Sequence, residues 1–336
     1  MNNQQTIQEI NSLNKLIEDI NYYLSNLSND YIGEVSTIEG IGDCEDVSIE
    51  FIHNKTLHFP VNNFKDISKS VRDLIKDELT IKLDFYESVL ESILNPTIEY
   101  QQLIDFWALK GLVLPSSTAR FYQDSLIRGL KEDGIWDKLE SFYVFANNSK
   151  ETAYTDWKRL ITGLETGVLN FEPYSHIANI DNFGFNTSYN PGINAVSEDN
   201  FHYSVYLKEA IGTCTPVGFI NTDISYCYLS NTAGNIIALN NQNVANGVIT
   251  TQNFSNNSLY ISNRNISGSD ISESGVSLGT TTNGGILADN NMILLADSTS
   301  LVDDGSKLSF FSVGTDISGL EMTFEDILDG YLFSVG

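Results

Sequence analysis

The carboxylates are the first residues to consider for chemistry, because the 336-residue chain carries 44 Asp and Glu against 18 Lys and Arg. A glycosidase needs two of them converging across a sugar, one as acid and one as base or nucleophile. Glu321, Glu325 and Asp326 fall in a segment with helical spacing, where a solvated helix face is the favoured interpretation. Asp223 and Glu209 are isolated. We expect a protein that is not an enzyme. A glycosidase is the alternative, since catalytic carboxylates need not be neighbours in sequence.

Other catalytic signatures are missing from the sequence. It contains no G-x-S-x-G, no H-E-x-x-H and no Walker loop. The four histidines form no cluster: His53, His58, His176 and His202. Nucleophilic, zinc-dependent and nucleotide-dependent chemistry therefore have no support.

Sugar binding has better support. Sugars are held by aromatic faces and by planar amide or carboxylate groups that hydrogen-bond to hydroxyls. The second half of the chain combines many Asn residues with Tyr174, Tyr189, Tyr203, Tyr226, Tyr228 and Tyr260. Loop positions and strand ends give five candidate glycan contacts: Tyr189, Asn190, Tyr260, Asn263 and Arg264. Strands bury alternate side chains, so a core or turn-stabilising role is the alternative for each.

One acidic loop is a candidate calcium site. Asp297, Asp303 and Asp304 lie beside Gly305 and offer the oxygen ligands that Ca²⁺ prefers. They do not follow the calcium-loop pattern D-x-[DN]-x-[DN]-G, and a solvated turn is the simpler interpretation. We expect no cofactor, with calcium at this loop as the alternative.

The overall charge limits the partners. A formal net charge of −26 repels nucleic-acid phosphates and anionic lipids. No apolar run reaches the roughly 20 residues that span a bilayer, and residues 1–6 lack the features of a secretory signal. Cys44, Cys214 and Cys227 fit no zinc spacing. We expect a soluble protein made in a cytosol, with reduced cysteines and no nucleic-acid or membrane partner.

Residues 1–30 predict a coiled-coil stalk. Apolar residues occupy heptad positions a and d without a break: Ile10, Leu13, Ile17, Ile20, Leu24 and Leu27. A lone amphipathic helix of this length is marginal in water, and so narrow a stripe suits a helical partner. We expect self-association through this stripe, and packing on its own domain is the alternative. The mixture of Ile and Leu does not select two strands over three.

Residues 31–99 predict an attachment module, a small hairpin followed by a long helix. Residues 46–52 alternate like a strand, and residues 56–59 can pair with it. Helical spacing then runs from Asp66 until Asn95-Pro96 stops it.

Residues 100–168 predict a helical shoulder. Thr97 caps one helix that ends at Gly111, and Pro115 to Ser117 opens another. Short helices are predicted over 136–145 and 153–164. The shoulder holds all three tryptophans, for which a core role is favoured over a ligand platform: Trp107, Trp136 and Trp157.

Residues 169–336 predict an all-β domain. Turn clusters such as Asn190-Pro-Gly192 separate short alternating runs. Predicted strands cover 184–186, 200–207, 217–220, 224–229, 236–239, 247–251, 259–262, 275–278, 292–295 and 308–313. An amphipathic helix over 316–328 and a closing strand at 331–333 follow. About ten short strands at this spacing favour a sandwich or jelly roll. The predicted fold class is α+β, with a helical stalk and shoulder followed by an all-β jelly-roll sandwich.

Two segments carry a family resemblance. Leu126 to Ala146 joins a helix to Gly134-Ile-Trp136-Asp-Lys138 and Tyr143-Val-Phe145, with Trp157 following. The second segment links residues 257–264, 275–279 and 308–314 to a helix at 322–327. Together they resemble the entry, the last three strands and the closing helix of tailed-bacteriophage virion proteins that end in a concanavalin A-like, laminin-G-type jelly roll.

The resemblance covers roughly residues 100–336 and implies a fold and a role but no catalytic residue. It implies a structural or adhesive part of a phage virion, namely a head fibre, tail fibre or capsid-decorating subunit. It further implies a homotrimer assembled in the host cytoplasm, attached to other virion proteins through its N-terminal region, with the jelly roll displayed toward a host cell-surface glycan. The alternatives are a glycan depolymerase or glycosidase on the same fold, a cellular laminin-G-like adhesin, and a purely structural spacer.

Overall fold

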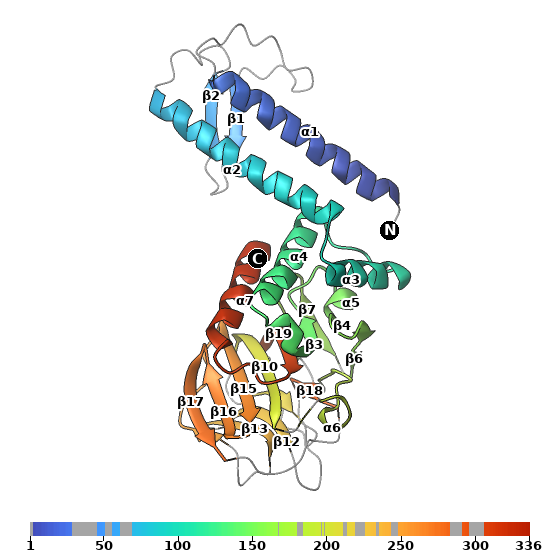
Figure 1. Ribbon diagram of the computed structural model, residues 1–336, viewed down its shortest axis with the longest axis vertical. Helices are drawn as coiled ribbons and strands as arrows, with labels where there is room; N and C mark the ends of the chain where they lie inside the picture. The colour runs from blue at the N-terminus through green and yellow to red at the C-terminus, as the bar shows by residue number, and fades with distance from the viewer. Residues whose placement is uncertain are drawn as a thin grey trace. The chain divides into compact units, whose positions relative to one another are not determined.

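The chain forms two compact units, residues 1–96 and residues 97–336. The structure is a computed structural model (Figure 1). It describes residues 3–28, 46–50, 56–60, 69–166, 168–179, 184–195, 197, 199–210, 214–218, 226–232, 235–242, 248–282, 291–295 and 306–336.

The N-terminal unit is a pair of long helices with a small hairpin. α1 (Asn3–Ser28) and α2 (Lys69–Leu94) lie side by side and run in opposite directions (Figure 1). The hairpin pairs β1 (Asp46–Glu50) with β2 (Thr56–Pro60) in antiparallel register. The predicted hairpin and long helix are therefore confirmed.

The heptad stripe of α1 is buried within the chain along one edge only. The d-position side chains Leu13 and Ile20 each keep 8% of their surface exposed, and on α2 Leu79 and Val89 are also buried. The side chain of Leu27 lies outside the described part of the structure. The a-position side chains are only half-buried: Ile10, Ile17 and Leu24. Packing on α2 thus accounts for part of the stripe, and self-association stays a prediction.

The C-terminal unit is a β-sandwich. The large sheet has the strand order β17-β16-β15-β10-β19-β3-β4-β5, and β8 pairs with both β19 and β7. The second sheet has the order β14-β13-β12-β11-β18-β9-β6. The described strand pairs are antiparallel.

The large sheet is built from β3 (Leu139–Val144), β4 (Thr155–Asp156), β5 (Ile161–Thr162), β7 (Leu169–Glu172), β8 (His176–Asn179), β10 (Asn200–Glu209), β15 (Ser258–Asn265), β16 (Gly268–Glu273), β17 (Val276–Thr281) and β19 (Lys307–Gly314). The second sheet is built from β6 (Leu164–Glu165), β9 (Phe185–Asn186), β11 (Cys214–Gly218), β12 (Tyr226–Thr232), β13 (Asn235–Gln242), β14 (Val248–Thr250) and β18 (Ile293–Leu294).

Two helices of this unit begin where the sequence predicts, one at the Thr97 cap and one within Pro115 to Ser117, with Ser116 as its cap. The N–H of Tyr100 donates to the Thr97 hydroxyl, and the N–H of Ala119 donates to the Ser116 hydroxyl, each at 3.3 Å. Such caps satisfy N–H groups that the first turn leaves free. The helical segments are α3 (Ile98–Leu109), α4 (Ser117–Glu132), η2 (Trp136–Lys138), α5 (Lys150–Ala153), α6 (Pro191–Asn194) and α7 (Glu321–Val335).

The large sheet separates two cores. On β3, Tyr143 packs between the sheets, whereas Phe142 and Val144 pack against the helices. This alternation follows from the two-residue period of a strand. The unit is therefore three layers deep, with α3, α4 and α7 on one face of the large sheet and the second sheet on the other.

The predicted core role of the tryptophans is confirmed, because all three are buried in the helix-facing core. Phe142 lies at the centre, with ring centroids 6.3 Å from Trp136 and 5.9 Å from Trp157. Trp107 meets Trp157 at 6.2 Å, and its indole N–H donates to the Thr155 hydroxyl at 3.0 Å. These rings join the helices to the sheet.

Three predicted elements are wrong. Residues 139–144 form the central strand β3 instead of a helix, because a strand buried on both faces carries apolar residues without alternation. Residues 153–164 contain β4 and β5 instead of a helix. Residues 331–333 continue α7 instead of forming a closing strand, since Phe324, Leu328 and Tyr331 bury one helical face. The α+β class and the β-sandwich themselves are confirmed.

Candidate functional site

An open pocket of about 170 Å³ lies where α4, α7 and the β7–β8 turn meet. Its lining consists of Ser116, Thr118, Ala119, Tyr122, Tyr174, Ser334 and Val335. Five of these seven side chains carry a hydroxyl and none is charged. Sites for drug-sized ligands occupy roughly 300–1,000 Å³, so this pocket suits one small group. We call it the Tyr174 pocket.

α4 is tied to α3 and α7 by residues that follow its pocket-lining part. The hydroxyl and the N–H of Thr97 both donate to Asp124 Oδ1, at 2.7 and 2.9 Å, which ties the start of α3 to α4. α4 also packs closely on α7, because a Cβ at Gly129 would lie 3.4 Å from Ile327 Cγ2. These contacts hold the two helices that line the pocket against each other.

Tyr174 reaches the pocket from a turn with unusual backbone geometry. It lies between β7 and β8 with φ of 57°, in the left-handed region. That region disfavours side chains by roughly 1–2 kcal/mol, and Gly or Asn usually occupies it. The Tyr174 N–H donates to the Asn147 carbonyl at 2.8 Å, which fixes the turn. The chain thus places a large ring at a position that suits a small residue.

The two pocket phenols are neutral hydrogen-bonding groups. Burial raises the pKa of Tyr122. Burial also raises the pKa of Tyr174, and a hydrogen bond with the Ser116 side chain partly offsets the rise. No charged group contributes to either shift. The pocket therefore offers aromatic surface and hydroxyls without a carboxylate, a cation or a nucleophile–base pair, which suits binding more than catalysis.

Tyr189 and Asn190, two candidate glycan contacts, have structural roles instead. Tyr189 is fully buried, its hydroxyl donates to the Glu140 carboxylate, and the Arg159 guanidinium lies 5.2 Å from its ring centroid. The Asn190 side chain accepts the Gly192 N–H at 2.9 Å and caps α6. The Tyr189 ring offers no free face to a sugar in this structure.

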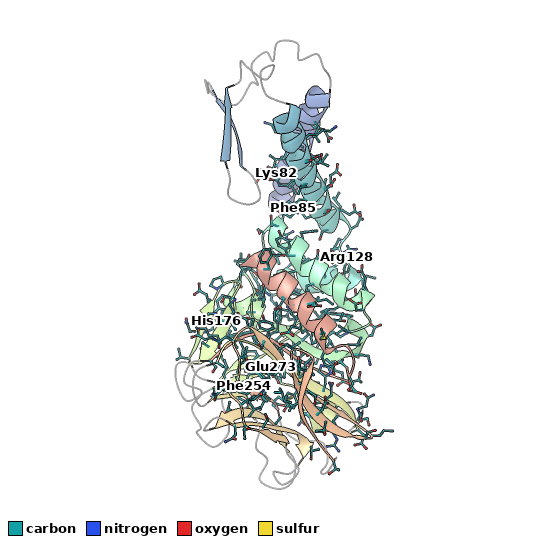
Figure 2. The ribbon with its side chains drawn as sticks, turned by 90° about the vertical axis from the view of Figure 1, so that its left-hand side faces the viewer. Lys82, Phe85, Arg128, His176, Phe254 and Glu273 are labelled. Carbon is teal, nitrogen blue, oxygen red and sulfur yellow. The ribbon has the colours of Figure 1, made fainter. Side chains whose placement is uncertain are left out.

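Tyr260 is also buried, between the sheets. Its hydroxyl donates to Glu273 Oε1 at 2.6 Å and accepts the Ser255 N–H at 2.7 Å. Phe254 meets its ring at 4.8 Å, and Figure 2 labels Phe254 and Glu273 in this region. Its burial therefore supports a core role for Tyr260.

Asn263 and Arg264 are buried at the end of β15. The Asn263 amide donates to Glu321 Oε1 at 3.0 Å, and its oxygen accepts the Ile317 N–H at 3.1 Å. Arg264 keeps 2% of its surface and donates to Asp199 Oδ1 at 3.2 Å. Both side chains stabilise loops, as the alternative interpretation expected.

Contrary to the prediction from the sequence, the carboxylates of α7 do not all lie on a solvated helix face. Glu325 is not on a solvated face, because it keeps 8% of its surface and accepts the Leu259 N–H and the Ser274 hydroxyl. Asp329 accepts the Tyr206 hydroxyl at 2.6 Å. Together with Glu321 on Asn263, these residues recur every fourth position and attach one face of α7 to the sheet. Asp326 is exposed, as expected.

The calcium prediction lies outside the described residues, since 296–305 are not among them. Within the described ranges, no group of three His, Cys, Asp or Glu residues is placed to hold a metal ion. Cys214 is buried and lies outside any disulfide within the described residues, whereas Cys44 and the side chain of Cys227 are not described. No helix in the described part is long and apolar enough to cross a membrane.

Sequence reasoning missed most of the Tyr174 pocket. Tyr174 stood among the tyrosines of the β half, but Tyr122 and Ser334 belong to helices that are far apart in sequence. The available signal was local: Glu172-Pro-Tyr174-Ser predicts a tight turn that would expose an aromatic ring. The partner helices could not be inferred from that turn.

No known protein family and no curated protein matches the chain. Among solved structures, it is similar to domain 4 of AbnA, a GH43 extracellular arabinanase from Geobacillus stearothermophilus in complex with arabinotriose, at 15% identity and a TM-score of 0.42 over 56% of this chain and 98% of that chain. It is similar to the botulinum neurotoxin serotype D binding domain at 14% identity and a TM-score of 0.44, over 58% and 52%. It is similar to Trypanosoma rangeli sialidase at 12% identity and a TM-score of 0.43, over 63% and 39%.

The chain thus spans about half of that neurotoxin chain and less of the sialidase. Identities below 25% and TM-scores below 0.5 assign the chain no family and no activity. The β-sandwich class follows from its own strand pairing.

Proposed function

We propose that the chain is a structural and adhesive subunit of a tailed-phage virion, acting as a head fibre, tail fibre or capsid decoration. In this proposal the N-terminal helices assemble a homotrimer and attach it to other virion proteins. The β-sandwich is displayed outward and holds a host cell-surface glycan. The subunit acts by binding, without catalysis.

One observation carries the proposal: the chain divides into a helical unit with a half-covered heptad stripe and a β-sandwich unit with its own cores. A two-helix pair covers one edge of the stripe, so the a-position residues have surface left for further helices. The resemblance of residues 100–336 to the jelly rolls of tailed-phage virion proteins supports a location on a phage particle. A net charge of −26 would keep many adjacent copies soluble and away from packaged DNA.

Light scattering tests the assembly. The full chain is expected as a trimer, and a truncated chain starting at Thr97 is expected as a monomer because the second unit has two cores of its own. A full chain that runs as a monomer near 37.3 kDa would remove self-assembly from the proposal.

A pair of matched variants separates assembly from folding. Ile17→Asp puts a charge on the half-buried a-position edge and should dissociate the trimer while the helix pair stays folded. Asn11→Asp adds the same charge at an exposed position of α1 and should leave the mass unchanged. If both variants remain trimeric, assembly does not use this edge.

A glycan array and a reducing-sugar assay test the adhesive half. Binding of the intact chain to at least one host glycan, without release of reducing ends, is the expected result. Release of reducing ends would favour the depolymerase alternative. If the chain binds no glycan, the adhesive role is wrong and the structural-spacer alternative is favoured.

A further inference from the structure

We propose that the Tyr174 pocket binds a single neutral sugar ring, such as the terminal unit of a glycan. This inference rests on the proposed glycan binding and gives that function a location. None of the five residues singled out as glycan contacts from the sequence lines this pocket.

The lining selects a neutral ligand. Its polar side chains are all hydroxyls, which both donate and accept hydrogen bonds, as sugar hydroxyls do. The pocket also lies between the first turn of α4 and the last turn of α7. Helix ends leave N–H donors at the start and C=O acceptors at the finish. The start of α4 favours negative charge and the finish of α7 favours positive charge, so neither an anion nor a cation is favoured by both ends, whereas a neutral hydroxyl group is not penalised at either.

Size and aromatic surface select one ring. A volume of about 170 Å³ leaves no room for an extended oligosaccharide. Tyr122 and Tyr174 enter from different elements, and both are partly exposed. They supply aromatic surface for the apolar face of a ring, and Ser116, Thr118 and Ser334 add hydroxyls to the lining. The Ser116 hydroxyl already accepts the Ala119 N–H and the Ser334 hydroxyl already donates to the Gly330 carbonyl.

The backbone of Tyr174 makes the proposal sharply testable. Asparagine tolerates φ near 57° better than tyrosine does, so Tyr174→Asn suits the turn while it removes the ring. A residue kept for folding alone should tolerate this change well. A residue whose ring holds the ligand should lose binding without losing the fold.

Methyl NMR on the full-length chain provides the readout. The probes are methyl glycosides of glucose, galactose, mannose and N-acetylglucosamine, with inorganic phosphate as an anionic comparison. At least one glycoside should shift the methyl signals of Ala119 and Val335 in a saturable way. The buried sandwich methyls of Val205 and Ala238 should not move.

The variants complete the test. Tyr174→Asn should weaken the sugar by about tenfold or more, the effect of losing one aromatic contact in a small site. Ser188→Gly is the matched control, because Ser188 also has positive φ, at 55°, but does not line the pocket. Ser334→Trp fills the pocket from an exposed position and should also abolish the shifts, which covers the case in which Tyr174→Asn folds poorly.

The outcomes separate this inference from the proposed function. Array binding that survives Tyr174→Asn and Ser334→Trp overturns the pocket but keeps the adhesive role. Saturable shifts without array binding keep the pocket and remove the adhesive role. No shift with any glycoside, or a tighter response to phosphate, overturns the neutral-sugar assignment.

Discussion

The two faces of the large sheet bury different kinds of side chain. Toward the second sheet, β10 presents Tyr203, Val205 and Leu207, which belong to an apolar and aromatic core. Toward the helices, the same strand presents His202, Ser204 and Tyr206. One strand thus carries apolar packing on one face and a buried polar network on the other.

In the hydrogen-bond network on the helix-facing side, the donor and the acceptor of each bond can be assigned. His202 Nδ1 lies 2.5 Å from the Thr315 carbonyl, which can only accept, so Nδ1 carries the proton. Nε2 then accepts from the Ser312 hydroxyl at 3.1 Å, and Ser312 accepts from Ser204 at 2.6 Å. The chain of donors is complete only while His202 is neutral.

The pH dependence of stability should arise on the helix-facing side of the large sheet. Burial lowers the pKa of His202 to about 4, and on the same face burial raises the pKa of Glu325. On the sandwich-facing side of β10, residues 203, 205 and 207 include no histidine and no carboxylate. Helix docking should therefore respond to acid, whereas sandwich packing should respond mainly to changes in volume.

The largest effect should come from Phe142→Ala. Phe142 is fully buried and contacts four rings on the helix-facing side, from Trp136, Trp157, Phe310 and Phe324. Removing such a side chain costs roughly 3–5 kcal/mol. Urea unfolding should show this loss in the free energy of unfolding, and hydrogen exchange should show α7 opening before the sheet.

Phe311→Ala provides the matched change on the opposite face. Phe311 is fully buried between the sheets and should lose a similar free energy of unfolding. It should not open α7 selectively. Equal opening of α7 in both variants would mean that the two faces behave as one cooperative unit.

The second effect is acid destabilisation through His202. Its folded pKa of about 4 lies below the ordinary value near 6.5, because burial disfavours the charged ring. The unfolded chain therefore binds the proton first as the pH falls. Stability is complete above about pH 6.5 and falls by about 3 kcal/mol on approaching pH 4. Thermal unfolding across this window measures the slope.

Variants on the two faces of β10 sharpen this test. His202→Gln should be less stable at pH 7, since it breaks the hydrogen-bond chain, but its stability should depend less on pH between 4 and 6.5. Tyr203→Phe alters the opposite face and should keep the acid slope of the unmodified chain. An unchanged slope in His202→Gln would assign the acid response to another group.

A third and smaller effect is expected at Glu325. Glu325→Ala leaves the Leu259 N–H, which it binds at 3.1 Å, buried without an acceptor. Such a loss costs about 1–3 kcal/mol. Asp326→Ala, one position along and exposed, should change stability by less than about 0.5 kcal/mol. Equal effects from the two variants would contradict the docking role of Glu325, and urea titration of both decides it.

These carboxylates show what could be predicted from sequence and what could not. The cap at Thr97, the helix start at Pro115 to Ser117 and the strands around residues 200–207 and 308–313 follow from local rules, and the structure confirms them. Glu325 and Asp326 are chemically alike and adjacent, and nothing local indicates which one meets a strand end. The register of α7 on the sheet decides that, and register is a tertiary property.

The same reason explains the errors in the candidate site. Tyr189 and Tyr260 are residue types that sugar sites use, but both are buried. Tyr189 contacts Glu140 and Arg159 from segments well before it in the sequence, and Tyr260 bonds to Glu273 on the adjacent strand β16. The sequence of β3 wrongly predicts a helix, because burial on both faces removes the alternation typical of a strand. The pocket residues Tyr122 and Ser334 meet only through the packing of α4 on α7.

The smallest predicted effect has the opposite sign to that of His202. Asp270 lies on β16, opposite Asn263 of β15 and hence on the helix-facing side. Burial, followed by the charges of Glu321 and Asp316, raises its pKa to about 6. A raised pKa means that the folded chain binds the proton more tightly than the unfolded chain. The stabilisation from protonated Asp270 is complete below about pH 4 and is lost as the pH rises through about 6.

Asp270→Asn should therefore stabilise the fold at pH 8 and have little effect at pH 4. The gain should stay below about 1 kcal/mol, because the side chain is partly exposed and solvent screens its charged neighbours. Glu273→Gln, on the neighbouring sandwich-facing position, should not reproduce this pH dependence. A gain that is equal at both pH values would show that the carboxylate is not titrating. The acid response of the helix-facing side would then belong to His202 and the carboxylates of α7.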